Sequence, residues 1–317
     1  MKNKRGFEFS FSWLFAIIVG ISILALAIYS AAKLINNERN TADTEGGKQL
    51  GILLNPLETS LESDKIAQIT FSAETRVFNA CRENGAFGSQ EISIATKSSL
   101  GDEWGHPGVP STFHNKYLFS DNIIQSKKIS VFAKSLNMPY KVADVVFAWD
   151  YENKYCFVNP PNVIRNEIES IHQDNLNVSD SISKCPKKSE KVCFSNSGCD
   201  IDVNLQAQRV LKSKKMVYYA LDSKGEYTLL YGAIFSSPEI YECQLRRLMG
   251  RASELALLYK AKSNYLSPKG CNSNLEGELG SYSNMTRAVN NSASIIALSR
   301  YSEEIGRDNE LLSCKLF

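Results

Sequence analysis

The residues with the greatest capacity for chemistry lie in one short stretch, GDEWGHPGVPSTFH, at residues 101–114. Asp102, Glu103, His106 and His114 fall within thirteen residues there. Imidazole and carboxylate groups bind divalent metals, so these four side chains are the candidate metal ligands of the chain. Their spacing matches no ligand pattern of a helix or a strand. The Gly, Pro and Trp residues between them favour an ordered surface loop instead.

One short motif resembles a catalytic one. Ser181-Ile-Ser-Lys184 fits the Ser-x-x-Lys pattern of acyl-transfer serines, but it lies in a polar stretch without the partner motifs of those enzymes. The sequence has no nucleophile elbow, no P-loop and no dinucleotide-binding glycine fingerprint. We therefore predict no catalytic residue and no cofactor. A metal-dependent extracytoplasmic enzyme that uses the 102–114 loop is the alternative.

The eight cysteines lie beyond residue 80, and their even number favours disulfides. Structural zinc sites usually need cysteine pairs two to four residues apart, whereas the closest pair here is six apart. We expect Cys314 to clamp the chain end, with Cys271 as a partner and Cys243 as the main alternative. The predicted disulfide cysteines are Cys81, Cys156, Cys185, Cys193, Cys199, Cys243, Cys271 and Cys314.

Several surface features accompany the cysteines. Asn-x-Ser/Thr sequons make Asn177, Asn284 and Asn290 candidate glycosylation sites. A lysine cluster is predicted to be a solvated loop, with anionic lipid headgroups or glycans as alternative partners; it contains Lys184, Lys187, Lys188 and Lys191. Three arginines are predicted to line the solvent face of a long helix: Arg246, Arg247 and Arg251.

These groups are carried by a chain with an apolar N-terminal segment. Residues 9–32 contain no charged side chain, and the 22 residues from Phe11 to Ala32 would form a helix about 33 Å long, enough to cross a membrane. Trp13 and Tyr29 suit its two interfaces. The alternatives are a cleaved signal peptide, with Ala25-Leu-Ala27 as its site, and a buried helix of a soluble protein.

Basic residues precede the span, and this positive-inside bias places the N-terminus in the cytoplasm and the chain after residue 36 outside. Small residues would let another helix approach, so we expect the membrane, and a protein partner or self-association, as interactions. They are Gly20, Ala25, Ala27 and Ala31.

The first residues also resemble the signal of archaeal type IV pilin-like proteins, which place basic residues and a small residue directly before an apolar helix. Lys4, Arg5 and Gly6 match this pattern, which implies cleavage between Gly6 and Phe7. Many pilins carry Glu at the fifth residue after the cut, where this chain has Phe11. The remainder resembles uncharacterised archaeal membrane-anchored surface proteins, a resemblance that implies no activity.

The pattern of the remaining chain predicts an α+β fold. We expect a tip and anchor at residues 1–35, a helical stalk at 36–60, a β-rich extracytoplasmic region at 61–235 and a helical region at 236–317 packed on it. Expected strands are Ile66–Phe71, Glu91–Thr96, Ile129–Leu136, Val142–Trp149, Tyr155–Val158, Val192–Phe194, Ile201–Leu205 and Met216–Leu221.

Local signals refine this pattern. Gly46-Gly47 predicts a break in the stalk, and residues 150–153 predict a hairpin turn. Residues 173–191 read as a loop between a short helix at 162–172 and the next strand. A capped helix should begin near Ser236, and a last helix should run from about 284 to 313.

Charge and composition narrow the class of function. Lys2, Lys4, Arg5 and Glu8 account for the net charge of +2, so the rest of the chain is neutral, which argues against nucleic-acid binding. The leading hypothesis is a membrane-anchored, non-enzymatic surface or pilin-like protein. An accessory subunit of a membrane complex is a further alternative.

Overall fold

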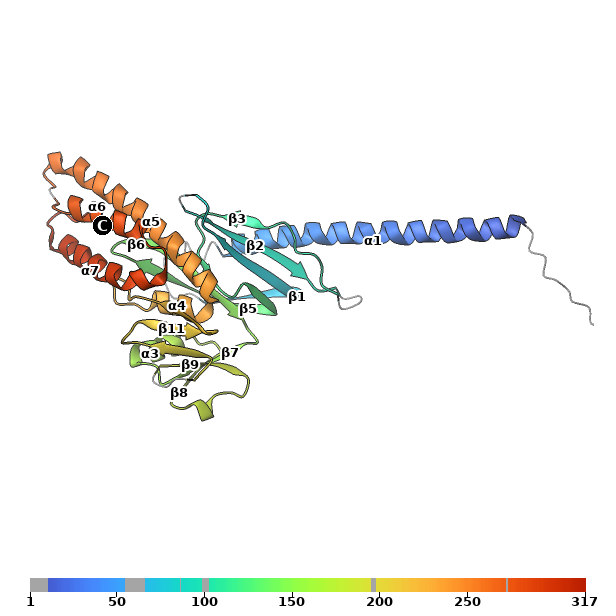
Figure 1. Cartoon of the computed structure of the whole chain (residues 1–317), viewed down its shortest axis with the longest axis horizontal. Coiled ribbons are helices and arrows are strands. Elements are labelled where there is room, and N and C mark those ends of the chain that lie inside the picture. Colours follow the sequence, from blue (N-terminus) through green and yellow to red (C-terminus); the bar gives the residue numbers. More distant parts are fainter. Residues whose placement is uncertain (1–10, 55–65, 86, 99–102, 195–197, 272) are drawn as a thin grey trace, which may run out of the picture.

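The computed structural model describes residues 11–54, 66–85, 87–98, 103–194, 198–271 and 273–317. It confirms the α+β class, with a long apolar N-terminal helix, strands in the middle and helices at the C-terminal end. Helix α1 (Phe11–Leu53) extends far from a head that contains all the other elements (Figure 1). The predicted cleavage site at Gly6 and the predicted end of the stalk lie outside the described residues.

The first sheet has six strands in the order β3-β2-β1-β5-β6-β4. β4 lies parallel to β6, and the other neighbours are antiparallel. The register of β1 against β5 shifts between Thr70 and Thr75. The strands are β1 (Ile66–Arg82), β2 (Ser89–Thr96), β3 (Ser111–Phe113), β4 (Leu118–Phe119), β5 (Ile123–Asn137) and β6 (Lys141–Asp150).

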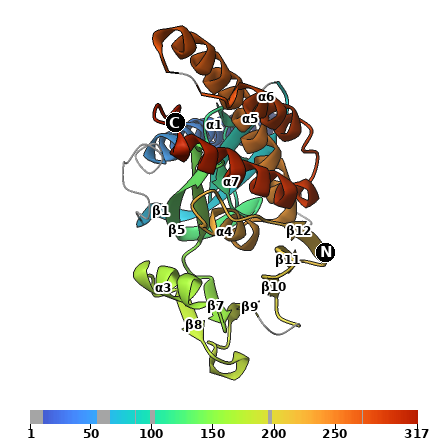
Figure 2. The same ribbon diagram turned by 90° about the vertical axis from the view of Figure 1, so that its left-hand side faces the viewer.

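The second sheet also has six strands, in the order β12-β11-β10-β9-β7-β8. Its β8-β7-β9-β10 half is parallel, and β10-β11-β12 is an antiparallel meander. Figure 2 shows most of this sheet below the first one. The strands are β7 (Lys154–Val158), β8 (Leu176–Ser179), β9 (Ser189–Cys193), β10 (Ile201–Asn204), β11 (Arg209–Lys212) and β12 (Lys215–Tyr218).

Helices complete the head, and α5 begins as predicted. Ser237 caps it by accepting a hydrogen bond from the Ile240 amide, and Pro238 occupies its first turn. The helices are α3 (Asn162–Ser170), α4 (Thr228–Phe235), α5 (Pro238–Leu266), α6 (Glu276–Arg287) and α7 (Ile295–Leu311). Short 3₁₀ turns are η1 (Ile182–Lys184), η2 (Ser267–Lys269) and η3 (Ser292–Ser294).

One aromatic core joins the two sheets. Phe235, at the end of α4, stacks on Trp149 of β6 at 4.5 Å between ring centroids and meets Tyr155 of β7 at 5.1 Å. Burial of such rings contributes most to the stability of a core. The predicted hairpin at residues 150–153 is therefore wrong. A turn does form there, with the Asn153 amide donating to the Asp150 carbonyl, but it carries the chain from the first sheet to the second.

Two further local predictions were wrong. Residues 173–191 are not one loop, because they contain β8, η1 and part of β9, and Cys185 of this stretch is bonded to Cys156 of β7. The last helix is two helices, α6 and α7. Asn291 interrupts it, because its side chain accepts a hydrogen bond from the Ala293 amide and so caps η3.

The structure pairs all eight cysteines, and Cys314 bonds to Cys271, the first of its two expected partners. Cys81 of β1 bonds to Cys243 of α5 and so links the first sheet to the C-terminal helices. Cys156–Cys185 and Cys193–Cys199 form, with Val158, a small buried cluster of their own on the second sheet. The expected disulfides thus support an oxidising environment for the head.

We predict that the disulfides contribute unequally to stability. Cys81 and Cys243 are 162 residues apart, and Cys193 and Cys199 only six. The loop-entropy relation gives about 5 kcal/mol for the longer loop and about 2 kcal/mol for the shorter one. Urea unfolding of the double variants Cys81→Ala/Cys243→Ala and Cys193→Ala/Cys199→Ala should show the larger loss in the first. Equal losses would contradict this ranking.

Candidate functional site

The N-terminal part of α1 is the most exposed apolar surface of the described chain. Trp13 is 56% exposed, Tyr29 65% and Ile35 62%, and none of the most apolar 18-residue window is buried against the head. By its length and composition this segment can cross a membrane. One candidate span near the N-terminus and a disulfide-bonded head fit a membrane-anchored extracellular protein.

The second part of α1 packs on β2 and β3, and glycines make this close approach possible. A Cβ atom at Gly51 would lie 2.0 Å from Cζ of Phe113, and one at Gly46 would lie 2.6 Å from Cδ1 of Ile94. A Cβ atom at Gly47 would lie 3.5 Å from the Ile92 carbonyl oxygen, which is an ordinary contact distance. The predicted break at Gly46-Gly47 is wrong, because α1 is continuous there.

A buried carboxylate fixes the docked part of α1. Asp43 is only 2% exposed, and its two oxygens accept hydrogen bonds from the amide and the hydroxyl of Thr96, at 3.2 and 2.9 Å. Arg39, one turn earlier, donates to the Thr96 carbonyl and to the Glu103 carbonyl. Because these bonds connect α1 to the end of β2, they set the register between the helix and the sheet.

Residues 103–110 form a strap across the docked part of α1. The Gly108 amide donates to the Ile94 carbonyl at 2.9 Å, and the Val109 amide donates to the Thr44 hydroxyl at 2.9 Å. A Cβ atom at Gly108 would lie 2.4 Å from the Thr44 amide nitrogen. The glycine-rich segment that the sequence singled out for metal binding is thus a contact between the helix and the head.

The candidate metal ligands do not come together. Glu103 and His106 have exposed side chains in the strap, and His114 Nδ1 lies 2.9 Å from the Gly88 carbonyl oxygen. Asp102 lies outside the described residues. Within the described parts of the chain, no three His, Cys, Asp or Glu side chains are grouped as a metal ion would require.

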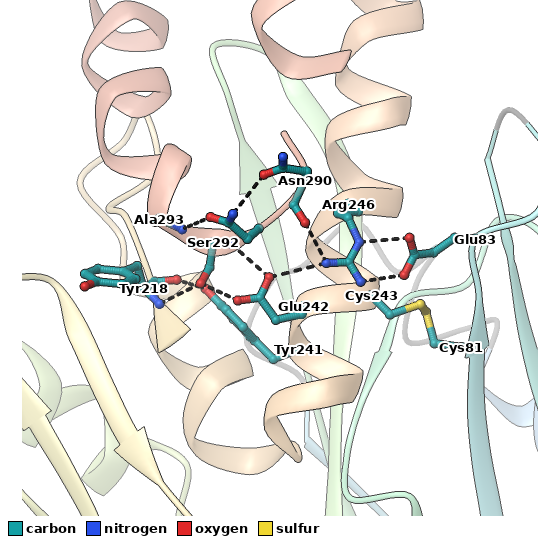
Figure 3. Close-up of polar contacts among 11 residues, drawn as sticks. Cys81, Glu83, Tyr218, Tyr241, Glu242, Cys243, Arg246, Asn290, Ser292 and Ala293 are labelled. Atoms are coloured by element: carbon teal, nitrogen blue, oxygen red, sulfur yellow. Dashed lines mark hydrogen bonds and ion pairs between the residues drawn. A yellow bond between two sulfur atoms is a disulfide. The ribbon is translucent and has the colours of Figure 1, made fainter. Parts of the chain in front are cut away.

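A second polar centre lies where α5 begins (Figure 3). Arg246 donates to both carboxylate oxygens of Glu83, at 2.9 and 2.5 Å, and to the Asn290 carbonyl at 2.9 Å. Glu242 accepts from the amide and the hydroxyl of Ser292, and that hydroxyl accepts from the Tyr218 amide. This network, beside the Cys81–Cys243 disulfide, connects both sheets to the α6–α7 connection.

Arg247 contradicts the prediction that the three arginines line a solvent face. It is 3% exposed, and its guanidinium donates to the carbonyls of Phe87, His114 and Lys116 and to the Gln244 side chain. Burial lowers its pKa below the usual arginine value. Arg251 is also engaged, donating to the Val142 carbonyl at 2.7 Å. These arginines bind backbone carbonyls of the head.

The other predicted surface residues lie apart from these centres. Ser181 bonds to Ser183, while Lys184 is exposed in η1, so no Ser–Lys pair is formed. Asn284 and Asn290 are exposed, as glycosylation requires. Asn177 does not meet that requirement, because it lies in β8 and its side-chain amide nitrogen is buried.

In comparisons with known proteins, no family model, no curated protein and no solved structure matches this chain. The functional argument therefore rests on the geometry described above. It describes an anchor, a docked helix and a rigid head, and it brings together no catalytic constellation among the described residues. Sequence reasoning missed Asp43 and Thr96 as a docking pair. The glycines at 46, 47 and 51, which share part of one helix surface, were the available signal for it.

The docking glycines give a test of this interpretation. Gly51→Ala should destabilise the head by about 1–3 kcal/mol, because the added methyl group overlaps Phe113. Gly20→Ala is the matched control, since a Cβ atom there meets nothing within 4 Å and alanine favours a helix. Denaturant unfolding of both variants in detergent measures the effect. A stabilised Gly51→Ala variant would show that α1 does not dock as described.

Proposed function

We propose that this protein is a pilin-like surface subunit, held in the membrane by α1, whose head lies outside the cytoplasm and which self-associates through α1. The observation that carries the proposal is the division of one uninterrupted helix. Its C-terminal part is fixed in the head by Asp43 and the glycines, whereas its N-terminal part is exposed and apolar. Such a helix both anchors the head and offers a long surface to other helices.

Two features support the orientation and the processing. The basic residues before the span favour a cytoplasmic N-terminus, and four disulfides in the head favour an oxidising compartment. Lys4-Arg5-Gly6 directly before the apolar run is consistent with processing after Gly6. Self-association is supported by Gly20, Ala27 and Ala31, which lie within about 20° of one helical face at 100° per residue.

An accessory subunit that binds a different membrane protein through the same small-residue face is the second candidate function. The metal-dependent enzyme has less support, because the described candidate ligands lie apart and the strap contacts α1.

Topology and processing are tested together. Protease added to intact cells should digest the head and leave the N-terminal tip protected, and mass spectrometry of the mature chain should find Phe7 at its start. A protected head would reject the orientation. A chain that begins at Met1 or near Lys33 would reject processing after Gly6.

Self-association is tested by filling the small-residue face. Gly20→Ile/Ala27→Ile should abolish chemically cross-linked oligomers in native membranes, and any filaments in negative-stain images, because the larger side chains separate the helices. Ser22→Ile, on the opposite face and outside the small residues named above, is the control and should leave the oligomers intact. Oligomers that survive the first variant would contradict the proposal. Hetero-oligomers with another protein, identified by mass spectrometry, would favour the accessory subunit.

A further inference from the structure

The N-terminal half of β1 has one unpaired edge. β5 pairs with residues 66–70, but β2 joins the other side of β1 only from Thr75 onward, apart from one bond from the Lys97 amide to the Glu74 carbonyl. Among the described residues, none pairs with residues 66–73 on that side. Eight residues of extended chain give an open edge about 27 Å long.

The sequence of this edge lacks the residues that usually protect one. Sheet edges are normally blunted by charged side chains, prolines or a covering element, because their free amides and carbonyls attract other strands. The sequence of residues 66–73, IAQITFSA, contains neither a charge nor a proline. The edge is therefore competent to pair with another extended chain.

A groove of about 440 Å³ runs between this edge and the docked part of α1. Ala42 and Gly46 line it from α1 together with Leu53, which is 56% exposed. Ile69 and Phe71, both half-buried, line it from β1. The groove thus combines free backbone groups on one wall with small and apolar side chains on the other.

The lining determines what the groove can accept. Among the described residues that line it, the one with a charge is Asp43, whose oxygens already accept two hydrogen bonds from Thr96, so this lining complements an uncharged occupant. A lipid acyl chain would leave the strand's amides and carbonyls without partners, which is costly away from water. An extended peptide satisfies them and places alternate side chains in the groove.

A second copy of this chain fits poorly. Antiparallel pairing of β1 with β1 requires a twofold axis perpendicular to the sheet. Because α1 packs on the face of that sheet, the axis would also reverse α1, and the two spans would point in opposite directions. Two copies anchored in one membrane cannot meet in this way.

We propose that residues 66–73 and the facing surface of α1 form a docking site for an extended, uncharged segment of a partner protein. The segment adds a strand to the first sheet and inserts apolar side chains between Ile69, Phe71 and Leu53. The site is separate from the exposed span, so it operates whether or not α1 self-associates.

Hydrogen–deuterium exchange on the full chain in detergent tests the site. The probe is the capped, uncharged peptide ISIAT, residues 92–96, because its Ile92 and Ile94 already occupy the same face of the sheet as Ile69. At about ten times its dissociation constant it should slow the fast-exchanging amides of residues 66–73 roughly tenfold. Ile69→Lys should abolish this protection. Leu53→Lys should also abolish the protection. Because Leu53 is exposed, a lysine there leaves the fold intact, so this variant separates loss of binding from loss of folding.

Ile52→Lys is the matched control, because Ile52 is 53% exposed, precedes Leu53 in α1 and lies outside the groove. It should retain the protection. No slowing in the unchanged chain, or equal slowing in the Leu53→Lys and Ile52→Lys variants, would overturn the proposal.

A photoreactive benzoylphenylalanine at Thr70, which lines the groove, tests the occupant on intact cells. The expected product is an adduct with one extended segment of another protein, and it should disappear when Leu53→Lys is added. An adduct with lipid or with a second copy of this chain, or no adduct at all, would overturn the proposed partner.

Discussion

The close approach of α1 to β2 is the contact on which the arrangement of the molecule depends. A side chain at Gly46 or Gly51 would overlap Ile94 or Phe113, so these glycines allow the helix to approach the sheet, and Asp43 reaches the end of β2. Because one helix continues from this contact into the apolar segment, the head and the anchor are one body. A separate stalk with a flexible joint would behave differently, since the head could then tilt freely.

The head itself is held by contacts between segments far apart in the sequence. Phe235 packs between the two sheets, and the Cys81–Cys243 disulfide with the Arg246–Glu83 pair joins the first sheet to α5. Lys134 of β5 pairs with Glu167 of α3, whose other oxygen accepts from Tyr231 of α4. These buried polar groups each have partners on a different element, and this fixes how the elements are oriented.

Sequence patterns predicted the elements that depend on local chemistry and failed where distant contacts decide. The apolar run at 11–32 and the Ser237-Pro238 cap predicted α1 and α5, because hydropathy and capping act within a few residues. The turn at residues 150–153 was recognised, but its role was not, since the strand after it pairs with β8 and β9, which lie later in the chain. Gly46-Gly47 predicts a break by helix propensity, whereas in the structure α1 continues through both residues and Gly46 packs against the Ile94 side chain of β2.

In the loop at residues 102–114, too, contacts with distant segments decided the structure. Its histidines and carboxylates suggested a metal site, whereas its glycines favoured an ordered loop, and in the structure Gly105 and Gly108 lie against α1. The arginines of α5 were assigned to solvent because charge usually lies there, whereas Arg247 finds three backbone carbonyls inside the head. Neither result can be read from a single sequence, because both depend on hydrogen-bond partners supplied by segments far away in the chain.

Two disulfides make the folding of the second sheet depend on oxidation. On one face of this sheet the disulfides Cys156–Cys185 and Cys193–Cys199 pack around Val158. In many sheets a helix would cover such a face. In a reducing cytoplasm those bonds do not persist, so this side of the sheet would remain open and the chain unfinished. Completion of this side of the sheet therefore depends on the oxidation of four cysteines, and a reductant would open it while leaving the separate aromatic core between the sheets in place.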